Sequence, residues 1–100
     1  MIKHIVLWKF CEEKDGLNKA EIMERVKSSL FKLPNIIFEI KSMEIGKDFL
    51  KTDMSYDMAL ITVFENEQAL KTYKEHPEHK KISEYVKSVR TARATIDFII

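Results

Sequence analysis

Three histidines are the side chains of this sequence best suited to proton transfer near neutral pH. His76 and His79 stand three residues apart in the segment His-Pro-Glu-His, where Pro77 interrupts any continuous helix. This spacing at a helix break allows both rings to point into one space. Tyr73 lies three residues before His76, so we expect it near the same rim. The alternative is that both histidines are solvated on the surface of a helix.

The third histidine lies on a predicted strand. His4 alternates there with Val6 and Trp8 on one face. A buried histidine of this kind is either a hydrogen-bonded core residue or a catalytic group. Asp97 alternates with Thr95 on the last predicted strand. If Asp97 faces the helices, its carboxylate can orient an imidazole, as in a catalytic triad; otherwise it is a surface charge at a strand edge.

Metal and nucleotide motifs have little support in the sequence. The two histidines at 76 and 79, with Glu75 or Glu78, place several ligand types close together. A catalytic zinc site, however, takes three fixed ligands with outer support, and no HExxH pattern is present. Glycine-rich nucleotide loops, GxSxG and CxxC are also absent. We therefore predict no metal and no organic cofactor.

Charge and composition exclude several classes of protein. Seventeen basic and sixteen acidic residues nearly cancel, and no basic stripe stands out, so we expect neither nucleic acid nor a membrane as a partner. No apolar stretch approaches the roughly 18 residues that span a bilayer, and the start does not resemble a signal peptide. The single cysteine, Cys11, fits a reducing compartment. We expect a cytoplasmic protein with one domain over residues 1–100.

The hydrophobic periodicity predicts the elements that position these side chains. Strands are expected at residues 2–10, 36–45, 56–64 and 94–100. Helices are expected from Asn18 to Pro34, from Asn66 to about Glu75, and from Pro77 onward, with a capping box formed by Asn18 and Glu21. Within 36–45 the apolar phase changes, which indicates a β-bulge near Lys41–Ser42, and Gly46 ends that strand.

The order β-α-β-β-α-β predicts an α+β, ferredoxin-like fold with a four-stranded antiparallel sheet and helices on one face. The other face then carries a patch of apolar side chains that no helix covers: Ile5, Leu7, Ala59, Ile61 and Val63. A soluble monomer rarely exposes such a patch. Two subunits that pair their sheets face to face about a two-fold axis would bury it. We therefore predict a homodimer, a dimeric α/β barrel.

Several segments resemble the stress-responsive α/β-barrel (Dabb) domain family. The resemblance is carried by residues 1–10, by Leu33-Pro34, by Tyr56–Leu60 with Phe64-Glu65, by Ala69–His79 and by Ile96–Phe98. It runs nearly end to end, and its strongest part is the His-Pro-x-His segment after an aromatic residue. It implies a ferredoxin-like subunit that forms a two-fold barrel with a pocket between sheet and helices. Most members of the family have no assigned reaction.

The same resemblance implies roles for particular residues. Plant relatives include a polyketide cyclase that closes a ring by aldol condensation without a metal or organic cofactor. In that type of member, the chemistry belongs to the positions of His79 and Tyr73, and the histidine of the first strand falls on His4. Cyclase-like members place a second tyrosine on the first helix, where this chain has Val26.

Two functions are compatible with these observations, and whether the protein is an enzyme stays open. The first is a stress-responsive barrel that binds a small apolar or aromatic molecule, with no assigned reaction. The second is a cofactor-independent cyclase or lyase, in which His79 takes a proton α to a carbonyl, Tyr73 stabilises the enolate and Asp97 holds the imidazole tautomer. A barrel monooxygenase has little motif support. The ligand is expected to touch His76 and an apolar wall made by Val6, Trp8, Met23, Val26, Met58 and Leu60.

Overall fold

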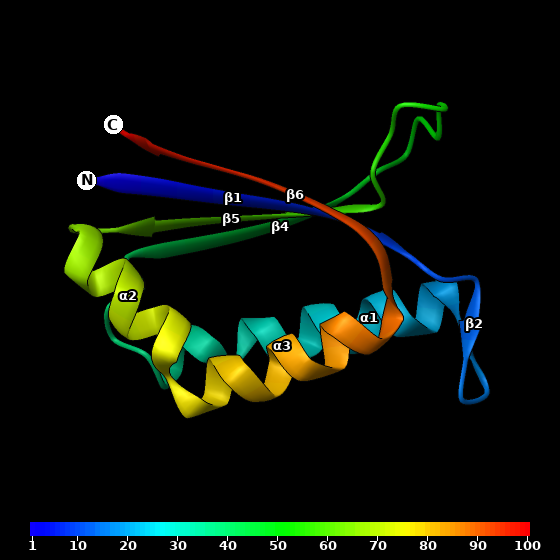
Figure 1. The fold of residues 1–100 in the computed structure, drawn as a ribbon, viewed down its shortest axis with the longest axis horizontal. Coiled ribbons are helices and arrows are strands. Elements are labelled where there is room, and N and C mark those ends of the chain that lie inside the picture. The colour runs from blue at the N-terminus through cyan, green and yellow to red at the C-terminus, as the bar shows by residue number, and fades with distance from the viewer.

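A four-stranded antiparallel sheet with three helices on one of its faces forms the molecule (Figure 1). The computed structural model describes residues 1–100. The strand order in the sheet is β4-β5-β1-β6, and the four-stranded antiparallel sheet of the predicted ferredoxin-like fold is confirmed. The strands are β1 (Ile2–Phe10), β4 (Ser42–Lys47), β5 (Met58–Phe64) and β6 (Arg90–Ile99), and the helices are α1 (Lys19–Phe31), α2 (Glu67–Glu75) and α3 (Pro77–Val89).

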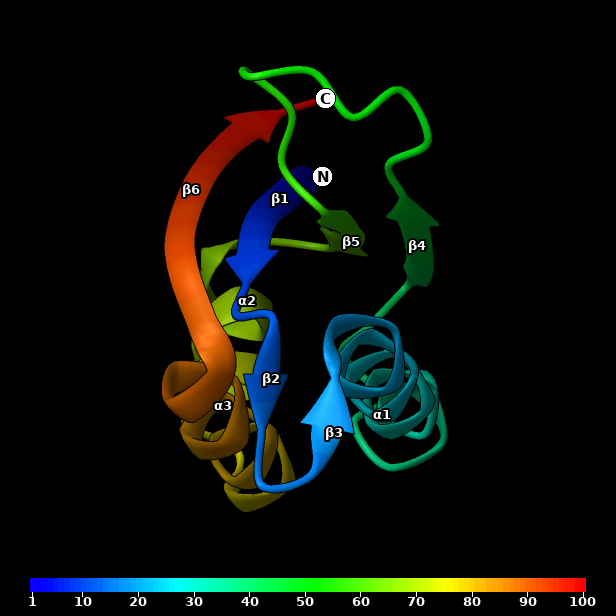
Figure 2. The same cartoon turned by 90° about the vertical axis from the view of Figure 1, so that its right-hand side faces the viewer.

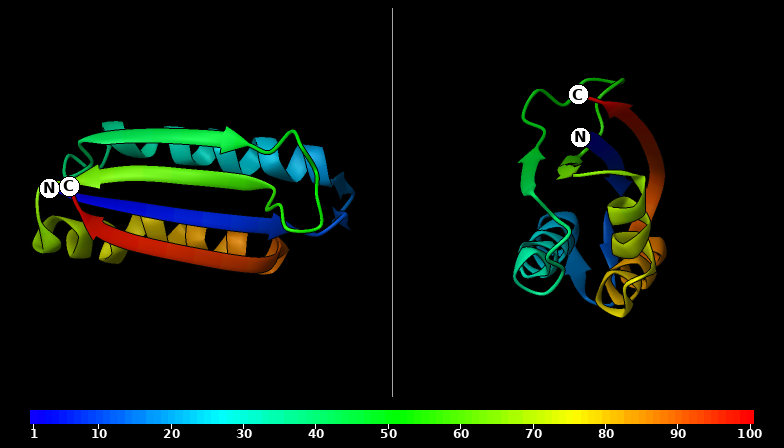
Figure 3. Two further views of the ribbon diagram at one scale, coloured as in Figure 1. Left: turned by 90° about the horizontal axis from the view of Figure 1, so that it is seen from above. Right: turned by 90° about the vertical axis from the view of Figure 1, so that its left-hand side faces the viewer.

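Strand β1 occupies the centre of the sheet, between β5 and β6. Val6 lies opposite Leu60, and His4 lies opposite Thr62 on one side and Asp97 on the other. Side chains alternate across a strand, so His4, Val6 and Leu60 share the face toward the helices and are buried there. Seen from above, the sheet lies over the helices with its other face open (Figure 3).

Helix α1 begins at the capping box that the sequence predicts. The Asn18 side chain accepts a hydrogen bond from the Glu21 backbone N–H at 2.9 Å, and the Glu21 carboxylate accepts from the Asn18 N–H at 3.0 Å. The helix packs Ile22, Val26 and Leu30 into the core. Its direction is therefore set by both its first turn and its apolar stripe.

A small hairpin precedes α1, in a segment for which no helix or strand was predicted. Strands β2 (Glu13–Lys14) and β3 (Leu17–Asn18) pair antiparallel (Figure 2). Asp15 and Gly16 link them with φ values of 52° and 83°. Two consecutive residues with positive φ are typical of the type I′ turn, and the Asp-Gly pair is among those that adopt it most readily.

The segment from Ile36 to Lys41 is not a strand, which corrects the predicted strand at 36–45. A short 3₁₀ helix, η1 (Leu33–Asn35), continues into a turn in which the Leu33 carbonyl accepts from the N–H groups of Ile36 and Ile37. Ile37 and Ile40 are buried, whereas Phe38 is 82% exposed. Burial at a spacing of three residues belongs to a helical turn, so the predicted bulge at Lys41–Ser42 does not exist.

Three other strand limits differ from the prediction. Gly46 does not end β4, because it pairs with Ala59 and the strand runs on to Lys47. Strand β5 starts at Met58, two residues later than predicted. Strand β6 starts at Arg90, four residues earlier than predicted. The last difference matters for the site, because it brings the residues between Arg90 and Ala94 into the sheet.

The face of the sheet away from the helices is apolar and uncovered. Ile5 lies between Ile61 of β5 and Ile96 of β6, in one row across three strands. The loop at residues 48–57, between β4 and β5, rises on this same side (Figures 1 and 2). Phe49, which is 88% exposed, lies in that loop. No helix of the structure is long and apolar enough to cross a membrane.

Candidate functional site

A cavity of about 330 Å³ is bounded by the sheet and by all three helices. Its apolar wall consists of Val6, Trp8, Leu30, Leu60, Ile82 and Val86. These residues come from β1, α1, β5 and α3, so the cavity exists only because the helices pack on this face of the sheet. A volume of this size is within the range of small-molecule sites in proteins.

The structure brings His4, Tyr73 and His79 together on this cavity. The Tyr73 and His79 rings have centroids 4.4 Å apart, and the His4 and Tyr73 rings have centroids 6.4 Å apart in an edge-on arrangement. The three side chains come from β1, α2 and α3. Each therefore depends on a different element for its position, and a phenol lies between two imidazoles.

The His79 ring is oriented by the end of helix α2. Its Nδ1 lies 3.2 Å from the backbone carbonyl oxygen of Lys74. A carbonyl can only accept a hydrogen bond, so Nδ1 carries the proton and donates it. The lone pair of this neutral imidazole is then on Nε2. His79 therefore has the tautomer that a base needs, with Nε2 free of protein partners.

The break between α2 and α3 explains why the Lys74 carbonyl is available. In a continuous helix, that carbonyl would accept from the Glu78 N–H four residues later. Instead, the Glu78 N–H donates to Nδ1 of His76, at 3.1 Å, so that His76 caps helix α3. His76 was predicted to touch the ligand, but it does not line the cavity. Its role in the structure is to begin α3 and so to place His79.

His4 is paired with Asp97 across the β1–β6 ladder. The two residues are opposite each other in the register, and the Asp97 carboxylate accepts a hydrogen bond from Nδ1 of His4. The sequence left open whether Asp97 orients an imidazole or is a surface charge at a strand edge; its carboxylate bonds to His4, not to His79. The pairing puts the proton of neutral His4 on Nδ1 and leaves Nε2 unprotonated, as in His79.

Burial controls the protonation of the three groups. It is the main cause that lowers the pKa of His4 and of His79 below 6.5, and it raises the pKa of Tyr73 well above 10.0. The bond to Asp97 opposes this shift in His4, and the bond to the Lys74 carbonyl opposes it in His79. At neutral pH the site therefore holds two neutral imidazoles and a protonated phenol.

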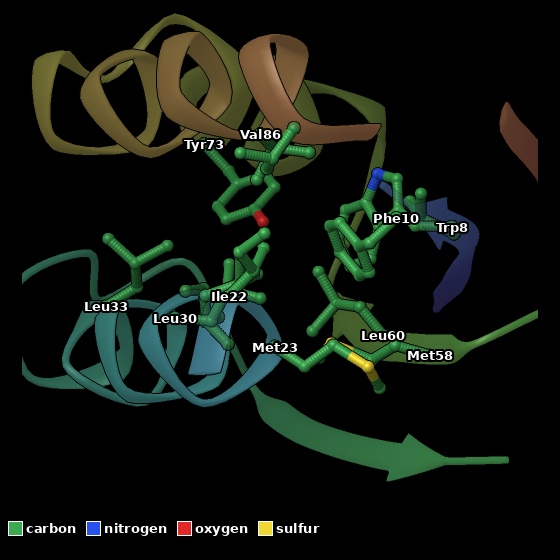
Figure 4. Packing of buried hydrophobic residues seen from close by; sticks show 14 of the residues in the cluster. Trp8, Phe10, Ile22, Met23, Leu30, Leu33, Met58, Leu60, Tyr73 and Val86 are labelled. Atoms are coloured by element: carbon green, nitrogen blue, oxygen red, sulfur yellow. The ribbon is translucent and has the colours of Figure 1, made fainter. Parts of the chain in front are cut away.

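The hydroxyl of Tyr73 has no hydrogen-bond partner in the protein. The residue is only 1% exposed, and its oxygen is buried. Figure 4 shows the ring reaching away from its helix, with the oxygen directed across the interior toward α1. Buried hydroxyl groups nearly always find a partner, because an unpaired one costs about 1–3 kcal/mol. A donor is thus left free beside the cavity.

Only part of the predicted apolar wall lines the cavity. Val6, Trp8 and Leu60 do so. Val26 and Met58 are instead surrounded by other core side chains, with 0% and 2% of their surface exposed. Met23 borders a separate surface depression near Lys19. Met23 and Val26 lie on α1 and Met58 lies on β5, and all three belong to the hydrophobic core. They lie away from the cavity because α1 packs directly on that part of the sheet.

The sequence interpretation missed the cationic lining of the cavity. Arg93 was placed outside the last strand, which was predicted to start at residue 94. In the structure it lies on β6 opposite Trp8, in phase with Asp97. The alternation of Arg93, Thr95 and Asp97 was the available signal. Arg90 follows the last residue of α3 and also lines the cavity.

No group of three or more His, Cys, Asp or Glu side chains is arranged so that it could hold a metal ion. His4 and Asp97 meet as a pair, and His79 bonds to a backbone carbonyl. The absence of a resident metal stays a prediction, which elemental analysis of the purified protein would test.

Comparison with known proteins identifies relatives over nearly the whole chain. The profile of the stress responsive A/B barrel domain, Dabb, matches residues 2–100. A search of curated proteins gives no match. Among solved structures, a dimeric ferredoxin-like protein of unknown function from Bacteroides fragilis is 28% identical, with a TM-score of 0.82 over 99% of this chain and 95% of that one.

Two further structures have the same fold. A dimeric ferredoxin-like protein of unknown function from Thermobifida fusca is 26% identical, with a TM-score of 0.83 over 99% of this chain and 90% of that one. A hydroxynitrile lyase from Passiflora edulis is 16% identical, with a TM-score of 0.82 over 99% of this chain and 92% of that one. The last similarity concerns the fold alone.

Proposed function

Because the chain belongs to the stress responsive A/B barrel (Dabb) domain family, we propose that it works as a homodimer that binds a small molecule in the cavity at His4, Tyr73 and His79. The ligand has a largely apolar or aromatic body and carries a carbonyl or phenol oxygen. The body packs against the wall that includes Val6 and Trp8, and the oxygen accepts a hydrogen bond from Tyr73.

The unpaired hydroxyl of Tyr73 is the observation that supports this proposal most. A buried donor without a partner destabilises the protein unless another group accepts a hydrogen bond from it. Water or a ligand oxygen in the cavity can do so. Since burial keeps the phenol protonated, it is a donor at any physiological pH.

The homodimer is supported by the uncovered sheet face and by the relatives. Ile5, Ile61 and Ile96 form an apolar row on that face, and structural neighbours from two bacteria are described as dimeric. The loop at 48–57 adds exposed apolar side chains on the same side, Phe49, Leu50 and Met54. A second copy that faces this sheet would bury all of them in a self-complementary interface.

Removing a single oxygen tests the binding proposal. Tyr73→Phe keeps the ring and deletes only the unpaired hydroxyl, so we expect the free energy of unfolding to stay the same or to rise by about 1 kcal/mol. Affinity for carbonyl-bearing ligands should fall about tenfold. Trp8, the only tryptophan, lines the cavity and reports binding by its fluorescence.

The matched control is Tyr85→Phe. Tyr85 lies on α3 outside the cavity lining, with its ring against Arg25, and this change also removes one hydroxyl. A panel of aryl ketones and phenols is titrated against the parent and both variants. The proposal fails if no compound in the panel binds, or if Tyr73→Phe and Tyr85→Phe bind all compounds equally well.

A second candidate function is cofactor-independent proton transfer at a carbon next to a carbonyl. It is favoured by the shared tautomer of His4 and His79, which leaves Nε2 of each as a base beside the Tyr73 donor. Nε2 of His79 would take the proton from the α-carbon, while the electron pair moves to the carbonyl oxygen and the Tyr73 hydroxyl stabilises the enolate. Return of a proton to carbon completes an exchange; attack of the enolate on a second carbonyl would give an aldol product.

Deuterium exchange tests this second function without knowledge of the natural substrate. A bound aryl alkyl ketone in heavy water should exchange its α-protons faster with the protein than in buffer alone, as measured by NMR or mass spectrometry. Exchange at the buffer rate, with binding demonstrated in the same sample, leaves ligand binding as the only supported function.

A further inference from the structure

Four cationic side chains line the cavity: Lys74, Lys87, Arg90 and Arg93. They lie at the end of α2, at the end of α3 and on β6, and three of the four are exposed while Arg90 is half-buried. The cavity therefore has an apolar wall shared by the sheet and the helices, and a cationic edge whose side chains are exposed or half-buried.

No carboxylate lines the same cavity. Lys87 has an exposed partner, with its Nζ 3.6 Å from Glu84. Lys74, Arg90 and Arg93 take part in none of the ion pairs of the structure. Over the whole chain the basic and acidic residues nearly balance, so a cavity lined by four cations and no carboxylate departs from the composition of the molecule.

Arg93 lies where its charge acts on all three aromatic groups of the site. Burial is the larger cause of the pKa shift of each, and the Arg93 charge lowers the pKa of His4, His79 and Tyr73 in addition. A cation that lowers all three pKa values favours negative charge anywhere between them. No carboxylate of the protein forms an ion pair with Arg93.

We propose that the ligand of this cavity is an organic anion, with its apolar body inside and a carboxylate or phosphate held at the opening by Arg93 and Arg90. This inference rests on the proposed small-molecule function and adds the charge of the ligand. A guanidinium can hold either group through two parallel hydrogen bonds, which is the geometry that planar carboxylates and phosphates share. Lys74 and Lys87 add charge without such directionality.

Matched probes separate the charge of a ligand from its body. Benzoylpropionate has an aryl ketone for the interior and a carboxylate at the other end, and its primary amide has the same body without the charge. The phosphate monoester of the corresponding keto alcohol completes the set, and each compound is made in several chain lengths. We expect the anions to bind at least about tenfold more tightly than the amide at low salt, and the difference to shrink as salt is added.

Charge-removing variants locate the effect. Arg93→Gln and, independently, Arg90→Gln should each weaken binding of the anion more than binding of the amide, and so remove most of the preference for the anion. Lys80→Gln is the control, because Lys80 is exposed on α3 outside the cavity and this change removes the same charge. The melting temperature of each variant is measured alongside, and two independent arginines keep the test valid if one variant is unstable.

The possible outcomes distinguish the small-molecule function from the charge of its ligand. Tighter binding of the carboxylate, or of the phosphate, supports the inference and tells which group the opening holds. Equal binding of anion and amide in the parent protein overturns the inference and leaves the small-molecule function intact. An anion preference that Lys80→Gln weakens as much as Arg93→Gln also overturns it, because the effect is then one of net charge. Binding of no probe contradicts both proposals.

Discussion

At the scale of single residues, the site consists of three side chains whose hydrogen bonds assign their protons. Nδ1 of His4 donates a hydrogen bond to Asp97, and Nδ1 of His79 donates one to the Lys74 carbonyl. The Tyr73 hydroxyl donates to no group of the protein. Two acceptors and one donor are therefore left for a molecule in the cavity. A reaction that moves a proton to and from carbon needs this combination.

We expect His79→Ala to abolish the α-proton exchange of a bound ketone while changing stability little. The ring is half-buried, and one neutral hydrogen bond contributes only about 1 kcal/mol. The exchange rate and the denaturation midpoint are measured on the same preparation. A variant that loses several kcal/mol instead would identify His79 as a structural residue, and one that keeps full exchange would remove it from the chemistry.

The lowered pKa values of His4 and His79 predict how stability depends on pH. In the unfolded chain both imidazoles titrate near 6.5, whereas burial lowers both pKa values in the folded state. The charges of Lys74 and Arg93 lower them further, and Asp97 opposes the shift in His4. Between the two pKa values the unfolded state binds more protons. The contribution to stability is therefore fully present above 6.5 and is lost as the pH falls toward the folded values.

Denaturant titrations at several pH values between about 7.5 and 5 measure this dependence. His79→Asn should reduce the slope of the unfolding free energy against pH in that window, since one of the two groups no longer titrates. Stability that rises on acidification through 6.5 would contradict the account.

At the scale of elements, the break between α2 and α3 is the device that positions His79. His76 caps α3 by accepting from the Glu78 N–H, and Pro77 supplies the first helical residue. We expect His76→Ala to lower the free energy of unfolding by about 1 kcal/mol, as loss of an N-cap does, and His76→Asn to restore it. Chemical denaturation of the three proteins measures both effects; equal stability of all three would show that the cap contributes nothing.

Local patterns predicted the elements that depend on local interactions. The capping box of α1, the alternation of β1 and the start of α3 at Pro77 are encoded within a few residues. The segment 36–41 was mispredicted because Ile36, Phe38 and Ile40 alternate as in a strand. Whether such a segment pairs or turns is decided by the Leu33 carbonyl and by burial of Ile37, which the pattern does not contain.

The candidate site was predictable only in part, for the same reason. Tyr73 and His79 could be associated because they lie on either side of one helix break. The partner of His4 could not be identified, since it depends on the register between β1 and β6, and His4 and Asp97 are 93 residues apart in the chain. Arg93 was missed because pairing with β1 sets the start of β6. This pairing begins at Arg90, four residues before the apolar pattern from which the strand was predicted.

At the scale of the whole molecule, the open sheet face predicts the effect of a buried charge. Ile61→Glu introduces a carboxylate into the apolar row that Ile61 forms with Ile5 and Ile96, so it should dissociate the proposed homodimer or unfold it. Light scattering after gel filtration gives the mass. Lys71→Glu, on the exposed side of α2, is the control for added negative charge. An Ile61→Glu protein that stays a stable dimer would show that the subunits associate through another face.

The most direct test of the binding account is the nitrogen NMR spectrum of the three histidines, with and without an aryl ketone ligand. His4 and His79 should show the Nδ1-protonated tautomer, and His76, whose Nδ1 accepts from Glu78, the Nε2-protonated one. On addition of ligand, we expect the Nε2 signals of His4 and His79 to shift and those of His76 to stay in place. Signals of His4 and His79 that do not move at saturating ligand, or a response confined to His76, would contradict the account.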